Sequence, residues 1–197
     1  MERDKAKRER QRRVLKPFLI YKYKGEPCEK QITCRFLIEN DFGMINKFQD
    51  EMYELIEEKE VYCKTSTAEL MEFCQMGADI LGLFDGHRFI AYSVAYYPGN
   101  RQENYGYELG VRGEELLQWA DFGITVVHVD YRGNNLQQKL LQMFEDYKPE
   151  QIHYVGCTVS PINQYSLHNV EMLGYQVKCR KIMYGNFDRF ILVKTLE

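Results

Sequence analysis

Apolar positions divide the chain into short strands and amphipathic helices. Residues 18–38 predict one or two strands around a Lys-Gly-Glu-Pro turn, with ITCRFLI as the stronger strand. Residues 79–97 predict a hairpin that turns at Asp85-Gly86, a dipeptide typical of tight hairpin turns. The first half of the chain therefore predicts three or four strands.

Two helices are predicted between these strands. The first begins at a helix cap formed by Asn40-Asp41, because apolar residues then recur at helical spacing. Its apolar stripe consists of Ile45, Phe48, Met52, Leu55 and Ile56. The second helix begins after Ser66, and Glu69 stands three residues further on, as in a capping box. Residues 98–111 predict a long loop, followed by a short helical patch at residues 114–119.

The second half of the chain alternates more regularly between strands and helices. The pattern predicts a strand at 122–129, a helix at 135–147, a strand at 152–159, a helix at 162–173 that ends at Gly174, and two strands at 175–184 and 187–195. This order predicts a mixed α/β (α+β) fold, in which helices pack on a central sheet of about six to seven strands.

Charge is distributed unevenly along the 197 residues. Residues 1–16 carry eight basic and three acidic side chains, whereas the whole chain has a net charge of −3. We therefore expect a basic arm at 1–16, solvated, disordered or helical, and a single domain at 17–197. The acidic balance of the domain argues against binding to nucleic acid, except through the arm.

The cysteines and the apolar runs of the sequence indicate the cellular compartment of the protein. The six cysteines show neither a C-x-x-C pair nor a zinc-ligand spacing, which predicts free thiols in a reducing environment and no metal. No signal-peptide pattern is present, and no apolar run approaches the length of a membrane span. The sequence therefore predicts a cytoplasmic protein without a membrane association.

The junction between the strand at 122–129 and the helix at 135–147 carries candidate chemistry. Arg132-Gly133-Asn134-Asn135 leads directly into the helix. The N-terminus of a helix presents unpaired N–H groups that hold phosphate, and a glycine lets the backbone approach a pyrophosphate. The nucleoside-triphosphate loop and the dinucleotide fingerprint are both absent. On these residues alone, an ordinary strand-to-helix turn is an equal alternative.

A second motif makes the first more specific. The window from Arg132 to Gln137 resembles the [Q/R]-x-x-G-x-[G/A] motif that binds acetyl-CoA in the GNAT acetyltransferase superfamily. About thirty residues downstream, VSPINQYSLHNVEMLGYQV resembles the next motif of that family. The matching residues are Asn163, Ser166, Leu173, Gly174 and Tyr175. The resemblance extends over residues 32–195, and FIAYSVAYYPGN is similar to bacterial members with unassigned acceptors.

The resemblance implies a fold and a set of residues that bind the cofactor. The strand before the loop would splay from its neighbour, and the pantetheine arm of acetyl-CoA would lie in the gap. Val127 and Val129 would face the arm, and the amides from Gly133 to Gln138 would hold the pyrophosphate. The complete predicted set is Val127, Val129, Arg132, Gly133, Asn134, Asn135, Leu136, Gln137, Gln138, Asn163 and Ser166.

The sequence departs from the family pattern at four positions. Asn135 and Gln137 stand where the family usually has small residues, although asparagine tolerates a positive φ. The tyrosine that many members use as an acid corresponds to Val170 here, and the glutamate often found on the preceding strand corresponds to Gly123.

Three side chains are candidates for the missing acid and base. Deprotonation of an amine needs a base, and His128, at the junction, matches a position that some members use. Asp121 shares the strand parity of the absent glutamate, and Tyr165 lies one helical turn from Val170. Each has an ordinary structural alternative, as packing or surface residues. Four glutamates in or near the long loop are solvated or attract a cationic acceptor: Glu103, Glu108, Glu114 and Glu115.

The resemblance implies an acetyl-CoA-dependent N-acyltransferase that acts directly on a small-molecule or peptide amine, without an acyl-enzyme. The alternative is a non-catalytic module that binds acetyl-CoA or CoA, which the missing tyrosine and the replaced glycines favour. A third hypothesis is an interaction protein whose basic arm contacts RNA or the ribosome. The acceptor, the acyl length and the oligomeric state stay open.

Overall fold

The computed structural model describes residues 15–57 and 59–196. Within these ranges, eight strands form one sheet in the order β1-β2-β3-β4-β5-β6-β8-β7. The strands are β1 (Phe18–Tyr23), β2 (Glu26–Phe36), β3 (Asp79–Asp85), β4 (Arg88–Tyr96), β5 (Trp119–Val127), β6 (Tyr154–Val159), β7 (Gln176–Met183) and β8 (Phe187–Thr195). The predicted mixed sheet is confirmed.

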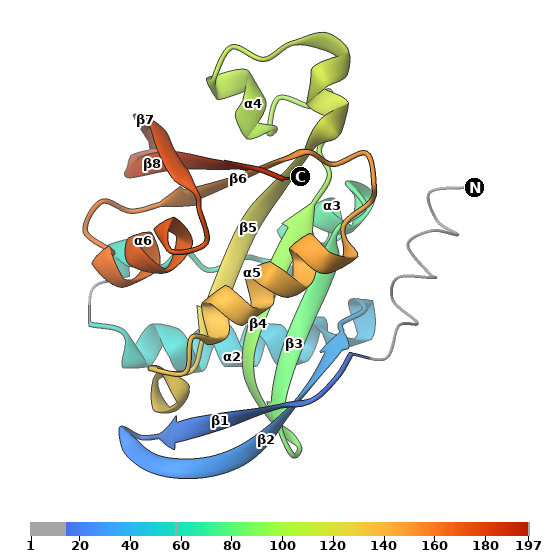
Figure 1. Ribbon diagram of the computed structural model, residues 1–197. Helices are drawn as coiled ribbons and strands as arrows, with labels where there is room; N and C mark the ends of the chain where they lie inside the picture. Colours follow the sequence, from blue (N-terminus) through green and yellow to red (C-terminus); the bar gives the residue numbers. More distant parts are fainter. Residues whose placement is uncertain (1–14, 58, 197) are drawn as a thin grey trace.

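The sheet has more strands than the sequence predicted. Residues 18–38 form two strands because Lys24 and Gly25 both adopt positive φ, at 52° and 83°, and make a tight hairpin turn. Among the described strands, the β5–β6 pair is parallel and the others are antiparallel. The α5 crossover joins that parallel pair, as Figure 1 shows.

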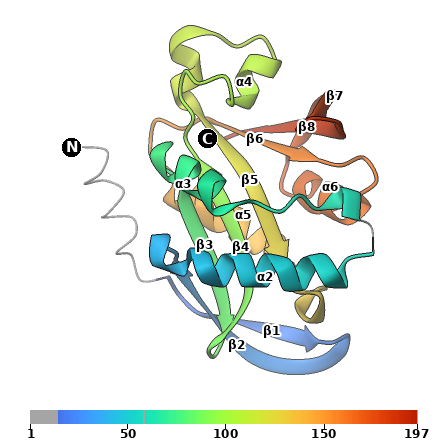
Figure 2. The ribbon, with the colours of Figure 1, turned by 180° about the vertical axis from the view of Figure 1, so that it is seen from behind.

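Helices cover both faces of the sheet. They are α2 (Phe42–Leu55), α3 (Thr67–Gln75), α4 (Tyr105–Glu108), α5 (Leu136–Tyr147) and α6 (Gln164–Glu171), with short 3₁₀ turns η1 (Glu39–Asp41), η2 (Lys59–Val61), η3 (Gly113–Gln118) and η4 (Val129–Tyr131). Helix α5 crosses one face, and α2 and α3 lie on the other (Figures 1 and 2). Strand β3 is accordingly buried along nearly its whole length.

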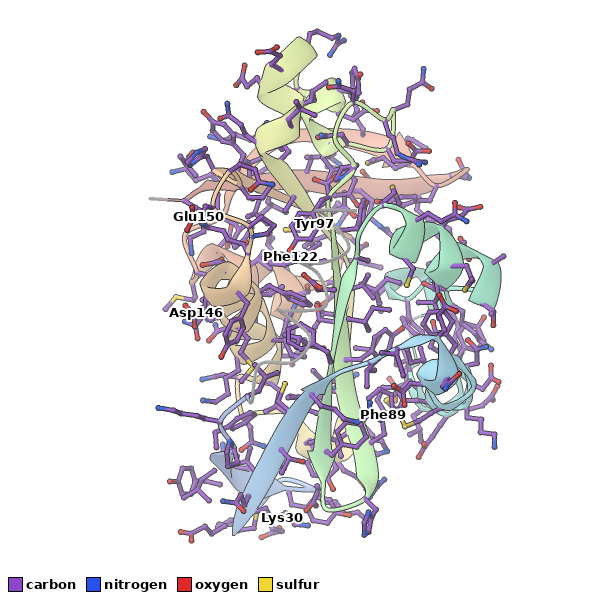
Figure 3. All side chains as sticks on the ribbon, turned by 90° about the vertical axis from the view of Figure 1, so that its right-hand side faces the viewer. Lys30, Phe89, Tyr97, Phe122, Asp146 and Glu150 are labelled. Carbon is purple, nitrogen blue, oxygen red and sulfur yellow. The ribbon has the colours of Figure 1, made fainter. Side chains whose placement is uncertain are left out.

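The core forms two clusters, one on each face of the sheet. Apolar residues of α5 pack with alternate residues of the central strands, among them Phe122. On the other face, apolar residues of α2 and α3 pack with the intervening positions, including Phe89. Figure 3 shows Phe122 and Phe89 on opposite sides of the strands. Leu15 belongs to the α5 cluster, whereas residues 1–14 of the predicted arm lie outside the described residues.

The first predicted helix cap is confirmed in position but makes no capping hydrogen bond, and the second is confirmed in full. Asp41 does not cap α2 with its side chain, because its carboxylate accepts from Ile38 N at 2.9 Å and pairs with the guanidinium of Arg35. Ser66 and Glu69 form the predicted capping box at the start of α3, with Glu69 N 3.2 Å from Ser66 Oγ and Ser66 N 2.7 Å from Glu69 Oε2.

The predicted long loop at 98–111 contains helix α4, which the sequence did not predict. The buried Asn104 organises this segment. Its side-chain amide donates to Gly99 O at 2.8 Å and Leu116 O at 3.1 Å, and its Oδ1 accepts from Gly106 N at 2.8 Å. This segment stands over the N-terminal end of β5 in Figure 1.

Strands β5 and β6 pair over only part of their length. The register runs from Trp119–Tyr154 to Phe122–Cys157, after which β5 continues along β4 alone as far as Val127. A register shift between Val94 and Ala95 of β4 marks a bulge at this point. The splay predicted for the strand before the loop is therefore confirmed.

Removing the Ser66 hydroxyl tests the capping box. We expect Ser66→Ala to lower the free energy of unfolding by about 1 kcal/mol, because the first turn of α3 loses its side-chain acceptor. Urea denaturation measures the change, with Glu150→Gln at an exposed position as the control. Equal stabilities of the two variants would contradict this account of α3.

Candidate active site

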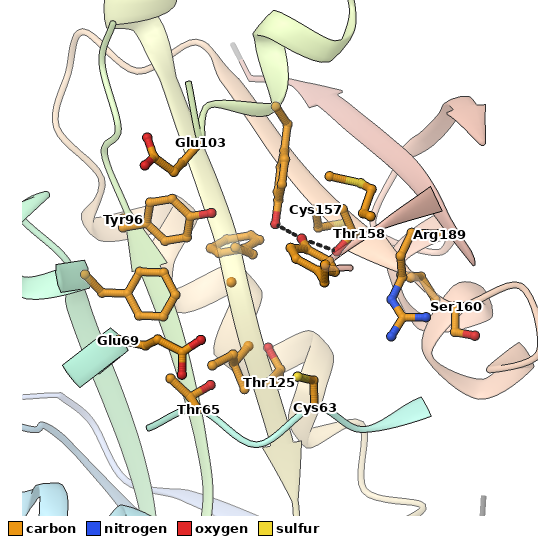
Figure 4. A pocket seen from close by; sticks show the side chains of 18 of the residues that line it. Cys63, Thr65, Glu69, Tyr96, Glu103, Thr125, Cys157, Thr158, Ser160 and Arg189 are labelled. Atoms are coloured by element: carbon orange, nitrogen blue, oxygen red, sulfur yellow. Dashed lines mark hydrogen bonds between the residues drawn. The ribbon is translucent and has the colours of Figure 1, made fainter. Parts of the chain in front are cut away.

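A cavity of about 850 Å³ opens where β5 and β6 diverge. Its wall is built from β5, β6, α3, α5, α6, the α4 segment and the β7–β8 turn, and Figure 4 shows this wall. The residues contributed by the two diverging strands and the segment after β6 are Phe122, Gly123, Ile124, Thr125, Cys157, Thr158, Val159 and Ser160. The cavity thus follows the part of β5 that lacks a partner in β6.

The loop between β5 and α5 has the backbone that the motif requires. Gly133 has φ 80°, and Asn135 is left-handed with φ 56° and ψ 30°. No side chain caps the helix at Asn135. The amide N–H groups of the first turn of α5 are therefore not occupied by a capping side chain and can accept an anionic ligand.

Asn134 fastens this loop to the first strand of the sheet. Its Oδ1 accepts from Tyr21 N and Lys22 N, both at 3.0 Å, and its Nδ2 donates to Lys22 O at 2.8 Å and Tyr131 O at 2.9 Å. The amide thus uses both donors and its oxygen. These hydrogen bonds fix the loop to β1 on one side and to its own start at Tyr131 on the other.

Gln137 bridges α5 and α6 across the entrance between them. Its Nε2 donates to Ser166 Oγ at 2.9 Å, and its Oε1 accepts from Asn169 Nδ2 at 2.9 Å. Asn163 in turn accepts from Ser166 N at 3.1 Å and caps α6. Gln137, Asn163 and Ser166 all line the cavity. The structure thus brings together three of the predicted residues from both motifs.

The other residues of the predicted cofactor set lie around the loop. Leu136 is buried in the core, so its backbone alone faces the loop, and Arg132 is exposed. Val127 is the last residue of β5, paired with Ala91, and Val129 lies in η4 rather than in the strand. The β5 residues that line the cavity are Phe122 to Thr125.

His128 is buried away from the cavity lining. Its Nδ1 accepts from Asp130 N at 3.1 Å, and its Nε2 lies 3.1 Å from Glu51 Oε1 and 2.9 Å from Arg88 Nη2. The ring also lies 6.2 Å from the Phe48 ring of α2. These contacts tie the start of the loop to α2 and to the β3–β4 hairpin.

Asp121 and Tyr165 occupy opposite environments. Asp121 is fully buried, and its Oδ2 accepts from Tyr105 N at 3.1 Å. Burial raises the pKa of this carboxyl well above its ordinary value of 3.8, although the hydrogen bond from Tyr105 opposes the shift. Tyr165 is 89% exposed and is not part of the cavity wall.

The structure reveals a chain of hydroxyl groups that the sequence analysis missed. Tyr184 OH lies 2.7 Å from Tyr105 OH and 3.0 Å from Thr158 Oγ1, and dashed lines mark these contacts in Figure 4. Burial raises the pKa of both tyrosines, so both phenols are protonated at neutral pH. The three residues lie far apart in the sequence, so no local motif joins them. The one feature of this group that the sequence shows locally is the tight turn next to Tyr184.

Carboxylates lie on the outer part of the cavity wall. Glu69, Glu72, Glu103 and Glu108 line it, and Glu108 forms an ion pair with Lys181. Figure 4 shows Glu69 and Glu103 on either side of Tyr96. Glu114 and Glu115 lie in η3, outside the lining.

No group of three or more His, Cys, Asp or Glu side chains within residues 15–57 and 59–196 is arranged to hold a metal ion. None of the helices in these ranges combines the length and apolar composition needed to cross a membrane.

The left-handed backbone at Asn135 yields a first test of the loop. Asn135→Gly should keep or raise the free energy of unfolding and preserve or tighten acetyl-CoA binding, because glycine adopts this conformation without strain. Asn135→Val should lose about 1–2 kcal/mol, because a β-branched side chain opposes a positive φ. Urea denaturation and calorimetry measure both effects. A Val variant as stable as the wild type would contradict the loop geometry.

The buried carboxyl of Asp121 yields a pH-dependent prediction. The pKa of the Asp121 carboxyl is raised in the folded state. The stability that this carboxyl contributes is therefore fully present below the unfolded pKa near 3.8 and is lost as the pH rises toward the folded pKa. Asp121→Asn does not titrate, so its stability relative to the wild type should increase from pH 4 to pH 7, by up to about 1.4 kcal/mol per unit. Parallel stability profiles of the two proteins would contradict a neutral buried carboxyl.

Comparison with known proteins supports the fold. No protein-family model and no curated protein matches the sequence. Among solved structures, a GNAT-family acetyltransferase from Streptococcus pneumoniae is 12% identical with a TM-score of 0.62, and the match covers 84% of this chain and 99% of that one. Arabidopsis thaliana NAA60 in complex with acetyl-CoA is 12% identical with a TM-score of 0.65, over 84% and 98% of the two chains.

A third similar structure contains CoA together with a second ligand. AAC(6')-Ib in complex with ribostamycin and coenzyme A is 13% identical with a TM-score of 0.63, over 83% of this chain and 93% of that one. All three likenesses extend over most of both chains and agree with the motifs in the sequence. The chain therefore has the GNAT acetyltransferase fold.

Proposed function

We propose that the protein is an acetyl-CoA-dependent N-acetyltransferase that transfers the acetyl group directly to an amine. The observation that carries the proposal is the divergence of β5 from β6, which opens a cavity bordered by α5. A gap between two strands exposes backbone N–H and C=O groups, which an extended ligand with amide groups satisfies as an added strand would. The pantetheine arm of acetyl-CoA has this shape and these groups.

The loop supplies the other end of the cofactor site. In the proposal, the pyrophosphate lies against the amides from Gly133 to Gln138, at the N-terminus of α5. Arg132 and Lys22 are both exposed and add positive charge at this end of the site. The Lys22 side chain lies beside Gly133, since a Cβ atom at that glycine would be 3.5 Å from Lys22 Cδ. Asn163 and Ser166 border the arm from α6.

The acceptor would enter from the side of α3 and the α4 segment. Glu69, Glu72 and Glu103 line this part of the cavity, and their charge favours an amine, on a small molecule or a peptide. At 13% and 12% identity, the likeness to AAC(6')-Ib and NAA60 does not indicate which of these two acceptor classes this protein uses. We place the reaction in the cytoplasm and in a single domain at 17–197, as the composition of the chain predicts.

The three candidate acids and bases from the sequence are unequally placed for this reaction. Asp121 is buried outside the cavity wall, and its carboxylate accepts from the backbone N–H of Tyr105. His128 and Tyr165 are not part of the cavity wall. A base role for His128 would therefore need a path of water molecules to the amine.

Two observations favour the alternative, a non-catalytic module that binds CoA. The Gln137 side chain spans the gap between α5 and α6. In addition, Val170 gives the cavity no hydroxyl group where many members of the family have a tyrosine. If no other residue replaced the tyrosine, a protein with this site would bind CoA and would not catalyse the transfer.

Calorimetry and a CoA-release assay separate the two functions. We expect acetyl-CoA to bind, and an amine panel to contain at least one compound that accelerates CoA release, detected with a thiol reagent. Binding without turnover on any amine would support the non-catalytic module and contradict the enzyme. The absence of binding would contradict both.

A pair of glycine variants controls for backbone strain. Gly133 and Gly86 both have positive φ, at 80° and 57°, and a Cβ at either position would meet no close contact. Gly133→Ala should weaken acetyl-CoA binding by roughly tenfold or more, because the strained loop no longer presents its amides. Gly86→Ala should cost comparable stability and leave the affinity unchanged. Equal affinities of the two variants would contradict the proposed pyrophosphate site.

A further inference from the structure

The closed end of the β5–β6 gap fixes where the reacting end of the cofactor would lie. The last paired residues are Phe122 and Cys157, and paired strands are only about 4.8 Å apart, which leaves no room for a ligand between them. An extended arm that enters near Gly133 must therefore end at this junction. Thr158 is the first residue of β6 beyond it, and it lines the cavity.

Three hydroxyl groups meet at this junction, each from a different part of the fold. Thr158 comes from β6, Tyr105 from α4 and Tyr184 from the β7–β8 turn. Tyr184 OH is central, since it lies 2.7 Å from Tyr105 OH and 3.0 Å from Thr158 Oγ1. A phenol oxygen accepts two hydrogen bonds and donates one. With Tyr105 and Thr158 as donors, the proton of Tyr184 is free for a third group in the cavity.

The backbone at Tyr184 is unusual for an aromatic residue. Its φ is 53°, in the left-handed region that bulky side chains rarely adopt. The next residue, Gly185, has φ 90°, so the turn places its strain on the tyrosine as well as on the glycine. The hairpin that Met183 and Phe187 close holds this conformation, as the β1–β2 hairpin does at Lys24 and Gly25, and it brings the Tyr184 side chain to the other two hydroxyl groups.

We infer that Tyr184 is the acid that protonates the departing thiolate of CoA, held in position by Tyr105 and Thr158. This inference rests on the proposed acetyl transfer. Val170 carries no hydroxyl group where many members of the family that the sequence resembles have a tyrosine, and Tyr184 brings a hydroxyl group to the cavity from the β7–β8 turn.

The step balances in atoms and charge. The amine nitrogen attacks the thioester carbonyl carbon and forms the tetrahedral intermediate. The carbon–sulfur bond then breaks, its electron pair goes to sulfur, and the Tyr184 proton moves to sulfur and yields CoA thiol. The acetylated nitrogen releases its extra proton, which returns to the Tyr184 phenolate directly or through Tyr105. One proton lost by nitrogen thus equals the one gained by sulfur.

Two hydrogen bonds and one charge limit the cost of the phenolate that this step produces. Burial of the phenol and the charge of Asp121 raise the pKa of Tyr184, although 51% of the residue is exposed, and this keeps the proton on the phenol before the reaction. The hydrogen bonds from Thr158 and Tyr105 and the charge of Arg189 lower the same pKa, and they act most strongly once the proton has left. Other groups near the junction are less suited, since Cys157 belongs to the buried apolar core and Asp121 is not part of the cavity wall.

The test uses CoA itself, so it does not depend on the acceptor. CoA with an isotope-labelled methylene beside sulfur is bound to the protein, and NMR follows the ionisation of its thiol with pH. We expect the thiol pKa of bound CoA to be roughly one unit lower in the wild type than in Tyr184→Phe, because the phenol donates a hydrogen bond to the thiolate. Calorimetry should show equal CoA affinity, within about twofold at neutral pH.

Tyr165→Phe is the matched control, since it removes the same hydroxyl group from a tyrosine that is 89% exposed and outside the cavity wall. It should leave the thiol pKa at the wild-type value. Tyr105→Phe removes one donor to Tyr184 and should produce a smaller shift in the same direction. This variant provides the test if Tyr184→Phe fails to fold.

Two negative outcomes are distinguishable. Bound CoA with the same thiol pKa in the wild type and in the Tyr184 and Tyr105 variants would overturn the role of Tyr184 and leave the acetyltransferase proposal standing. A wild-type protein that does not bind CoA would overturn the proposed function and this inference together.

For an amine that is turned over, Tyr184→Phe should lower kcat by roughly 100-fold with an unchanged KM for acetyl-CoA.

Discussion

The divergence of two parallel strands is the constraint on which the rest of the structure depends. Backbone N–H and C=O groups need partners when they are buried, so a sheet that opens in its interior must place those groups beside a ligand or water. Stacking of Trp119 on Tyr154, with ring centroids 5.2 Å apart, holds the first residue pair of the β5–β6 ladder together, at the end away from the gap. The apolar clusters on the two faces hold each strand to its helices. The gap is thus built into the packing.

The loop between β5 and α5 depends on its two asparagines in different ways. Asn134 is a structural residue, because its amide makes four hydrogen bonds to β1 and to the loop itself. Asn135 adopts the left-handed conformation that the family pattern assigns to glycine. Gln137, in contrast, adds a side chain where a small residue is usual, and it joins α5 to α6. The loop therefore retains the backbone of the motif while its side chains are used for packing.

The sequence predicted those features that depend on neighbouring residues. The capping box at Ser66, the left-handed Gly174 after α6 and the strand–loop–helix at Gly133 are local, and all three are present. Helix α2 begins after Asp41 as predicted, but its side chain does not cap the helix, because Arg35, on β2, pairs with the carboxylate. The hydroxyl chain could not be predicted, since its contacts join residues 79 and 26 positions apart. The placement of His128 against Glu51 is likewise a tertiary contact, 77 residues apart.

The central claim is that the unpaired edge of β5 and the start of α5 form one continuous cofactor site. Amide hydrogen exchange of the free protein and of its complex with CoA measures this most directly. The account predicts that CoA slows exchange at the amides of residues 123–127 that face β6 and at those of residues 133–138, with little change in β7. If CoA left amide exchange unchanged in both of these segments, the result would contradict the account.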